Sequence, residues 1–270
     1  MINNKTLVNI AVQVVVCLLV CFSTTVFAAA KGCPAQYWSG IAPSIGEQMA
    51  VKSHEICYSS FAVMHSGITR SPLWSAEHLT RKNLVRAKGL MRVNNFHADD
   101  HLSHSERAEL IDYARSGYDR GHMAPSGDMP NSISQEECFT LANMIPQNHD
   151  NNTVLWEGIE AAVRTFAKRE GELYVITGPL YLGDSVNVIH GRVMVPSHIY
   201  KVIYDTSQSK GAAYYVENKP GMGWQALSIA ELEKISHINF FPSMSLMAKQ
   251  VKLDIPAPTP YERKQNRSYK

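Results

Sequence analysis

The sequence predicts a mixed α+β fold in which a largely antiparallel central sheet is flanked by helices. Strand-like segments follow one another without a long helix between them, at 58–65 and 70–79 and again at 192–204 and 211–216. Such runs of neighbouring strands are typical of antiparallel sheets, whereas a regular alternation of strands and helices would indicate a parallel sheet. One long helical segment at 150–170 separates the two groups of strands.

The first thirty residues have the composition of a targeting segment. Lys5 is the only charge before an apolar run from Leu7 to about Phe22, and three alanines at 28–30 supply a small-residue cleavage site. The run is short for a membrane span. We therefore expect residues 1–30 to be a signal peptide that directs export, to the periplasm or out of the cell, with no stable membrane association after cleavage. An uncleaved anchor is the alternative.

The mature chain would be nearly neutral, because loss of Lys5 leaves 25 basic residues against 24 acidic ones. This balance excludes the uniformly basic surface of an architectural nucleic-acid binder. About 240 residues suffice for one core, and we expect a single domain over 31–254. Residues 255–270 contain three prolines in five positions and a basic end, and we expect this tail to be disordered.

Three cysteines remain after the signal peptide, and none belongs to a CxxC pair that would indicate zinc. We expect a disulfide between Cys33 and Cys57, which would tie an irregular arm at 33–56 to the first strand. Cys138 would then be free and buried. The sequence leaves the other two pairings open.

The remaining elements follow from turn and breaker residues. Ser66-Gly67 separates the strands at 58–65 and 70–79, and Gly117 ends a short helix predicted at 106–115. Gly171 ends the long helix over 150–170. Further strands are expected at 173–177, 192–204 and 211–216, and a late helix at 228–235.

One motif carries most of the chemical information, the segment 118–128 around Arg120-Gly121-His122. A guanidinium suits a phosphate, and an imidazole suits proton transfer near neutral pH. Gly121 would let the backbone bend or approach a ligand closely. We place the motif in a loop or short strand, because Pro125 and Pro130 exclude a long helix. An ordinary turn histidine is the alternative for His122.

The long helix supplies a second group of polar residues. With Asn152 at zero on a helical wheel, Glu160 falls near 80° and Arg164 near 120°, beside a separate apolar face. All three could point into one cleft, although Glu160 and Arg164 could also form a plain surface ion pair. Combined with His122, the stripe indicates metal-assisted hydrolysis of a phosphodiester.

These residues together resemble the DNA/RNA non-specific endonuclease family, whose active site is the ββα-metal, or His-Me, finger. The resemblance extends from about Cys57 to Asp205. Its motifs are Asp119–His122, Ala142–Gln147, the strand 73–77 after Arg70, and Asn152 with Trp156, Glu160 and Arg164. The family resemblance implies a ββα-metal finger within the predicted sheet and helices.

The resemblance also implies a role for each site residue. His122 would be the general base, and Asn152 the one direct protein ligand of a Mg²⁺ ion, with Mn²⁺ or another divalent cation as a substitute. Glu160 would orient metal-bound water, and Asn143 would support the metal site. Magnesium usually takes a carboxylate, but an amide ligand would leave more of the ion's charge for the phosphate.

Three arginines match positions of the family that contact phosphate or support the transition state, namely Arg70, Arg120 and Arg164. The implied substrates are DNA and RNA, cut without sequence preference to give 5′-phosphorylated products, because contacts to phosphate carry no sequence information. The sequence does not decide whether the protein forms a homodimer.

Two other functions are consistent with the same residues. One is a catalytically silent, secreted protein that binds nucleic acid or another polyanion. The other is a narrower phosphodiesterase that acts on small or modified substrates.

Overall fold

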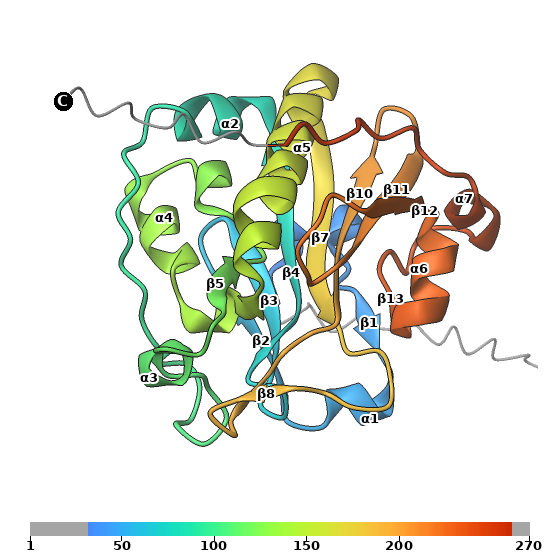
Figure 1. Cartoon of the computed structure of the whole chain (residues 1–270). Coiled ribbons are helices and arrows are strands. Elements are labelled where there is room, and N and C mark those ends of the chain that lie inside the picture. The colour runs from blue at the N-terminus through green and yellow to red at the C-terminus, as the bar shows by residue number, and fades with distance from the viewer. Residues whose placement is uncertain (1–31, 261–270) are drawn as a thin grey trace, which may run out of the picture. The chain divides into compact units, whose positions relative to one another are not determined.

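The structure is a computed structural model that describes residues 32–260 (Figure 1). The signal peptide predicted at 1–30 lies outside the described residues. Among the described residues, no helix combines the length and the apolar content that crossing a membrane requires.

A seven-stranded sheet forms the centre of the fold (Figure 1). Its strands lie in the order β12-β11-β10-β7-β4-β3-β2, and every neighbouring pair is antiparallel. The predicted antiparallel sheet is therefore confirmed. The strands are β2 (Ser53–Cys57), β3 (Phe61–Ser66), β4 (Ser71–Thr80), β7 (Glu172–Leu180), β10 (His198–Asp205), β11 (Lys210–Glu217) and β12 (Trp224–Leu227).

Three two-stranded ladders and a set of mostly short helices complete the fold. The ladders pair β1 (Ser44–Ile45) with β13 (Ile238–Asn239), β5 (Asp119–His122) with β6 (Met144–Gln147), and β8 (Val188–Ile189) with β9 (Val193–Met194). The α-helices are α1 (Glu47–Ala50), α2 (Arg81–Ala87), α3 (Leu110–Tyr113), α4 (Ser132–Cys138), α5 (Glu157–Glu170), α6 (Ile229–Ser236) and α7 (Leu246–Gln250). Single turns of other helix types are η1 (Pro34–Gln36), η2 (Trp38–Gly40), η3 (Ser126–Asp128), η4 (Leu141–Asn143) and η5 (Asn151–Trp156).

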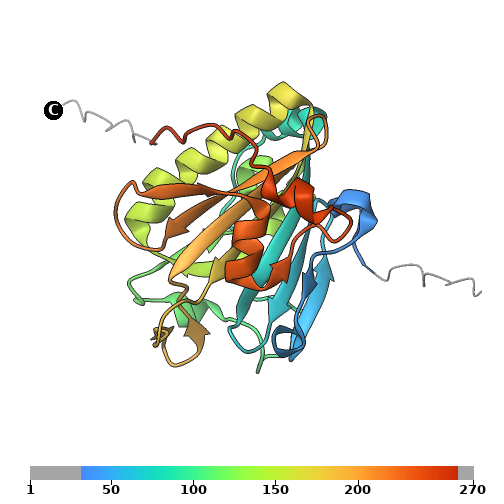
Figure 2. The same cartoon turned by 90° about the vertical axis from the view of Figure 1, so that its right-hand side faces the viewer.

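Both faces of the large sheet are covered by packed side chains. Neighbouring residues on a strand point to opposite faces, so each strand contributes to both layers. Val175 and Ile199 join the cluster that holds the apolar face of α5, whereas Ile176 and Tyr200 join the cluster that holds α6. Figures 1 and 2 show α5 and α6 on opposite sides of the sheet. The fold therefore has three layers, and α5 is fixed to one face of the sheet by its buried side chains.

The helix predicted at 106–115 is shorter than expected. Only Leu110–Tyr113 is helical, because the backbone N–H of Glu109 bonds the Asp112 carboxylate and starts the helix there. The chain leaves the helix after Tyr113 and reaches the left-handed region at Arg115, with φ 57°. The late helix is confirmed at Ile229–Ser236, where Ser228 caps its first turn.

The helix predicted at 150–170 is confirmed, with one local difference. Its first turn, η5, is a wider π-helical turn, and regular α-helix begins at Glu157. Gly171 ends the helix with φ 107°, a backbone conformation that glycine tolerates best.

The predicted disulfide between Cys33 and Cys57 is present, with Cα atoms 5.4 Å apart. Cys138 is buried and is a free thiol, also as predicted. The arm at 33–56 is more regular than expected, because it contains β1, α1 and β2 as well as two short turns.

The chain continues to pack past residue 254, where the prediction placed the start of a disordered tail. Ile255 is buried in the core, and the Tyr214 hydroxyl donates to the carbonyl of Pro256 over 2.6 Å. Gly158 of α5 lies so close to the chain that an added Cβ would meet the carbonyl oxygen of Thr259 at 2.4 Å. Residues 255–260 are thus part of the fold, and 261–270 lie outside the described residues.

The β5–β6 ladder carries the Arg120-Gly121-His122 motif, which is a short strand as predicted. Gly121 is needed for packing rather than for approach to a ligand. A Cβ at this position would lie 1.9 Å from Gln147 Oε1 and 2.6 Å from Gln147 Cβ. Gln147 is fully buried and its Nε2 donates to Asn151 Oδ1, so it has no room to move aside.

We predict that Gly121→Ala destabilises the protein by about 1–3 kcal/mol, the usual cost of overpacking a buried site. Urea denaturation would measure the loss. Gly46→Ala is the matched control, because Gly46 has an ordinary φ of −69° and no atom within 4 Å of an added Cβ. Equal stability of the two variants would contradict this account of Gly121.

Candidate active site

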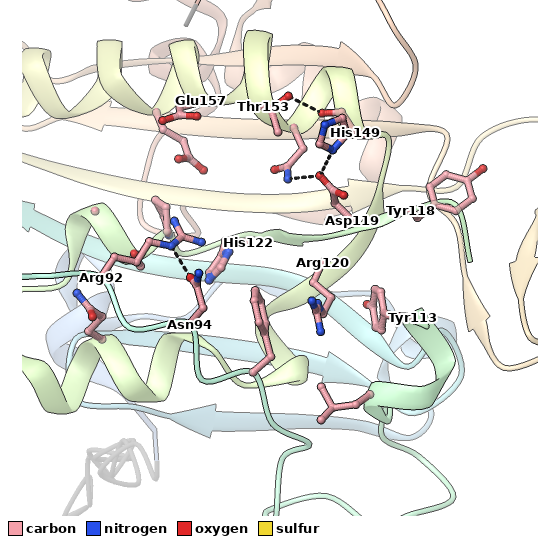
Figure 3. Close-up of a pocket in the computed structure, with 18 of the residues that line it drawn as sticks. Arg92, Asn94, Tyr113, Tyr118, Asp119, Arg120, His122, His149, Thr153 and Glu157 are labelled. Carbon is pink, nitrogen blue, oxygen red and sulfur yellow. Dashed lines mark hydrogen bonds and ion pairs between the residues drawn. The ribbon is translucent and has the colours of Figure 1, made fainter. Parts of the chain in front are cut away.

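A cleft of about 820 Å³ brings the two predicted groups of polar residues together (Figure 3). Arg120 and His122 line it from β5, whereas Asn152, Glu160 and Arg164 line it from η5 and α5. The residues predicted from the motif and from the helical stripe therefore face one space, although thirty residues separate the two groups in the sequence.

His122 is held on the cleft wall by aromatic packing. Arg120 and His122 point to the same side of β5, where both contact Phe96, at 4.1 Å and 5.7 Å from its ring centre, and Phe139 packs edge-on against the imidazole. Burial lowers the pKa of His122 to about 3, helped by the charges of Arg92 and Arg120. Its Nε2 is buried without a hydrogen-bond partner among the described residues. His122 is therefore a neutral imidazole at pH 7, as a general base requires.

Asp119 fixes the side chain of Asn152. Its Oδ2 accepts a hydrogen bond from Asn152 Nδ2 over 2.9 Å and lies 2.9 Å from Nδ1 of His149. Because the amide nitrogen of Asn152 is bound to Asp119, its oxygen is the atom left for another ligand. The amide oxygen of Asn152 and the carboxylate of Glu160, which lines the same cleft about two turns further along the helix, are donors of the kind that Mg²⁺ accepts.

Glu160 and Arg164 form part of a buried charge cluster rather than a surface ion pair. Their side chains are only 13% and 20% exposed, and Arg164 Nη1 lies 3.8 Å from Glu160 Oε2 and 3.1 Å from Asp128 Oδ1. Burial raises the pKa of Glu160 to about 7, against the opposing charge of Arg164. A cation entering the cleft would favour the ionised carboxylate of Glu160.

Two further charged residues lie buried near the cleft and were missed by the sequence analysis. Lys201 of β10 is 1% exposed, and its Nζ donates to Thr177 Oγ1 over 2.7 Å. Both carboxylate oxygens of Glu77 on β4 are buried without a partner among the described residues, and burial raises its pKa well above the usual value. Burial therefore favours the neutral form of the Glu77 carboxyl.

Arg70 does not line the cleft, so the structure does not place it where the predicted phosphate contact would occur. Its Nη1 donates to the carbonyl of Arg192 over 2.7 Å, and its Nε and Nη2 donate to the carbonyl of Ser105. The Arg70 guanidinium thus donates three hydrogen bonds to two backbone carbonyls and joins segments of the fold.

Asn143 does not line the cleft either. It is fully buried, its oxygen accepts from Ser75 Oγ and the N–H of Ala124, and its nitrogen donates to the carbonyls of Ala124 and Cys138. With every polar atom satisfied by protein, Asn143 holds the chain that follows His122 and is not placed to bind a metal.

Other cleft residues were not predicted. Arg92 and Phe96 come from the segment at 88–96, which has no periodic pattern to mark it. Thr153 and Glu157 also line the cleft, and the helical wheel could have found them, since they fall near 100° and 140° beside Glu160 and Arg164.

The lowered pKa of His122 predicts a pH-dependent stability. An unfolded histidine titrates near 6.5, so between pH 6.5 and about 3 the unfolded chain binds more protons than the folded one. The free energy of unfolding should therefore fall as the pH is lowered, and His122 should contribute about 2 kcal/mol of the loss between pH 7 and pH 5. Urea denaturation of the wild type and His122→Asn at both pH values would measure this. Equal losses in the two proteins would show that His122 is not buried in neutral form.

Comparisons with known proteins place this site in a family. Residues 42–246 match the profile of the DNA/RNA non-specific endonucleases. The human mitochondrial nuclease EXOG is 32% identical over 211 residues, which is 70% of this chain and 57% of EXOG. Nuclease C1 of Cunninghamella echinulata var. echinulata is 31% identical over 69% of this chain and 82% of its own length.

A solved structure shows a similar fold. The crystal structure of the EndoG/EndoGI complex, described as showing the mechanism of EndoG inhibition, contains a chain that superposes with a TM-score of 0.67 at 29% identity. The match covers 72% of this chain and 88% of that chain.

The comparisons correct the predicted location. EXOG of human and frog and nuclease 1 of Schizosaccharomyces pombe are mitochondrial nucleases, so these relatives point to mitochondria and the prediction of export is wrong. This chain spans between half and two thirds of the length of the EXOG relatives that it matches. The family match itself covers most of the described residues, and the chain belongs to the DNA/RNA non-specific endonuclease family.

Proposed function

We propose that the protein is a metal-dependent endonuclease that hydrolyses phosphodiester bonds of DNA and RNA without sequence preference. The observation that carries the proposal is the shared cleft, in which a neutral His122 and the free amide oxygen of Asn152 face the same space. Membership of the family supports the substrate class.

His122 is the proposed general base. Its imidazole takes a proton from the attacking water, and the water oxygen bonds the phosphorus as the bond to the 3′-oxygen breaks. The products are a 5′-phosphate and a 3′-hydroxyl, the latter after the leaving oxygen takes up a proton. Because its pKa lies below the usual range, His122 is present almost entirely as the base at pH 7.

Asn152 and Glu160 are the proposed holders of the metal ion. Asn152 would bind it through the amide oxygen that Asp119 leaves free, and Glu160 would act through a bound water molecule. A bound Mg²⁺ or Mn²⁺ would neutralise charge on the phosphate and on the leaving 3′-oxygen. Asp119 keeps the Asn152 carboxamide in one orientation, which lowers the cost of binding the ion.

The arginines of the cleft are proposed to position the phosphate backbone. Arg120 is held over Phe96. Arg92 is exposed and lines the same cleft, while Arg164 is partly neutralised by Asp128. Contacts of this kind recognise phosphate and carry no sequence information, in keeping with action on both DNA and RNA.

Digestion of plasmid DNA and of RNA tests the proposal. With Mg²⁺ we expect cleavage of both, products whose 5′-phosphates a phosphatase removes, and no cleavage in EDTA. His122→Asn should lower the rate about 10²–10⁴-fold, the usual contribution of a general base. Asn152→Ala should be equally impaired and should need more metal. Lys234→Ala, an exposed charge change on α6, is the control and should keep full activity.

Two results would contradict the proposal. Full activity in EDTA would exclude the metal, and an unimpaired His122→Asn variant would exclude His122 as the base. Salt-sensitive binding of nucleic acid without cleavage under any divalent ion would instead identify a protein that only binds nucleic acid.

A further inference from the structure

A side groove opens from the cleft at Tyr118. Arg115 and Tyr118 line the cleft, and the same two residues line a neighbouring groove of about 320 Å³ whose far wall includes Asn187, His190 and Val195. A smaller hollow of about 150 Å³ also begins at Tyr118. Because Tyr118 borders all three spaces, it stands at the exit from the catalytic cleft.

The two residues at this exit have the chemistry to hold a nucleotide. Arg115 is exposed and makes no ion pair or side-chain hydrogen bond with another described residue. Tyr118 is half-buried and packs against the apolar cluster that contains Ile189 and Val195. An unpaired guanidinium beside a half-buried aromatic ring matches a phosphate next to an unpaired base.

The far wall of the groove is firmly attached to the rest of the fold. Arg192, in the turn between β8 and β9, pairs through Nε with the buried Asp112 over 2.9 Å. Arg70 donates to the carbonyl of Arg192, and the N–H of Met194 donates to the carbonyl of Thr69 over 3.1 Å. The groove is therefore formed before a ligand arrives, which reduces the ordering cost of binding. Arg70 thus helps to hold the far wall of the groove in place.

We propose that a nucleic-acid strand leaves the catalytic cleft over Tyr118, with the base of a flanking nucleotide stacked on its ring and a flanking phosphate at Arg115. This inference rests on the proposed nuclease function and extends it. It makes the preferred substrate a polymer whose bases next to the cut are unpaired, because a base inside a duplex is not free to stack on tyrosine.

Steady-state kinetics on two substrates test the exit groove. A single-stranded oligonucleotide of about ten residues would reach the groove, whereas bis(4-nitrophenyl) phosphate would fill only the cleft. Tyr118→Ala should lower kcat/KM for the oligonucleotide relative to the small diester by about 5- to 100-fold, mainly through KM, given the usual effect of losing one stacked base. Tyr118→Phe should restore most of the ratio, which separates stacking from a folding defect.

Arg115→Ala should raise KM for the oligonucleotide and reduce the slope of log KM against log salt by about 0.7, as expected for one phosphate contact on a single strand. Lys234→Ala removes the same charge from α6 and should change neither value. The Tyr118→Ala substitution should lower kcat/KM less for a fully paired duplex than for the single strand.

The outcomes separate this inference from the proposed function. If the wild type cleaves both substrates and the ratio of their kcat/KM values is unchanged in Tyr118→Ala and Arg115→Ala, the proposed binding at the exit groove is wrong and the nuclease proposal stands. If the wild type cleaves neither, the nuclease assignment fails. Fluorescence anisotropy of the labelled oligonucleotide in EDTA then decides about the groove, because weaker binding by Tyr118→Ala supports it and equal binding overturns it.

Discussion

The hydrogen bond between Asp119 and Asn152 is the contact on which the candidate site depends. The β5–β6 ladder that carries His122 is only four residues long and is separate from the large sheet, whereas α5 is fixed to that sheet by its apolar face. Two side-chain bridges join the ladder to the first turn of the helix, Asp119 to Asn152 and Gln147 to Asn151. They set the position of the proposed base relative to the proposed metal ligand.

Burial shifts the pKa values of His122 and Glu160 so that both side chains favour their neutral forms. The aromatic wall around His122 lowers the pKa of the imidazole, and the enclosed position of Glu160 raises the pKa of its carboxyl. The consequences differ, because a neutral imidazole is ready to accept a proton, whereas a neutral carboxyl is a poor partner for a cation. A cation that enters the cleft would therefore favour the ionised form of Glu160. The same positive charge would keep the imidazole of His122 neutral.

Periodic patterns in the sequence predicted the elements well, and the spacing along the helix predicted at 150–170 correctly grouped Asn152, Glu160 and Arg164, which line one cleft from η5 and α5. The sequence patterns could not predict contacts that form only when distant segments fold together. Arg70 and Asn143 have side chains suited to phosphate or metal, and only the three-dimensional structure shows that backbone groups occupy them. Arg92 lies in an irregular segment with no pattern to mark it. The location inferred from the apolar run and the small-residue site in the first thirty residues was overturned by the mitochondrial relatives.

Diffraction from crystals soaked in Mn²⁺, recorded at a wavelength where manganese scatters anomalously, would test the arrangement most directly. The account predicts one strong peak in the cleft at about 2.1–2.2 Å from Asn152 Oδ1, close to the distance at which small divalent cations bind oxygen. Asn152 Nδ2 should still donate to Asp119, and a water molecule should lie between the ion and Glu160. An ion bound directly by Asp119, or bound away from Asn152, would contradict it.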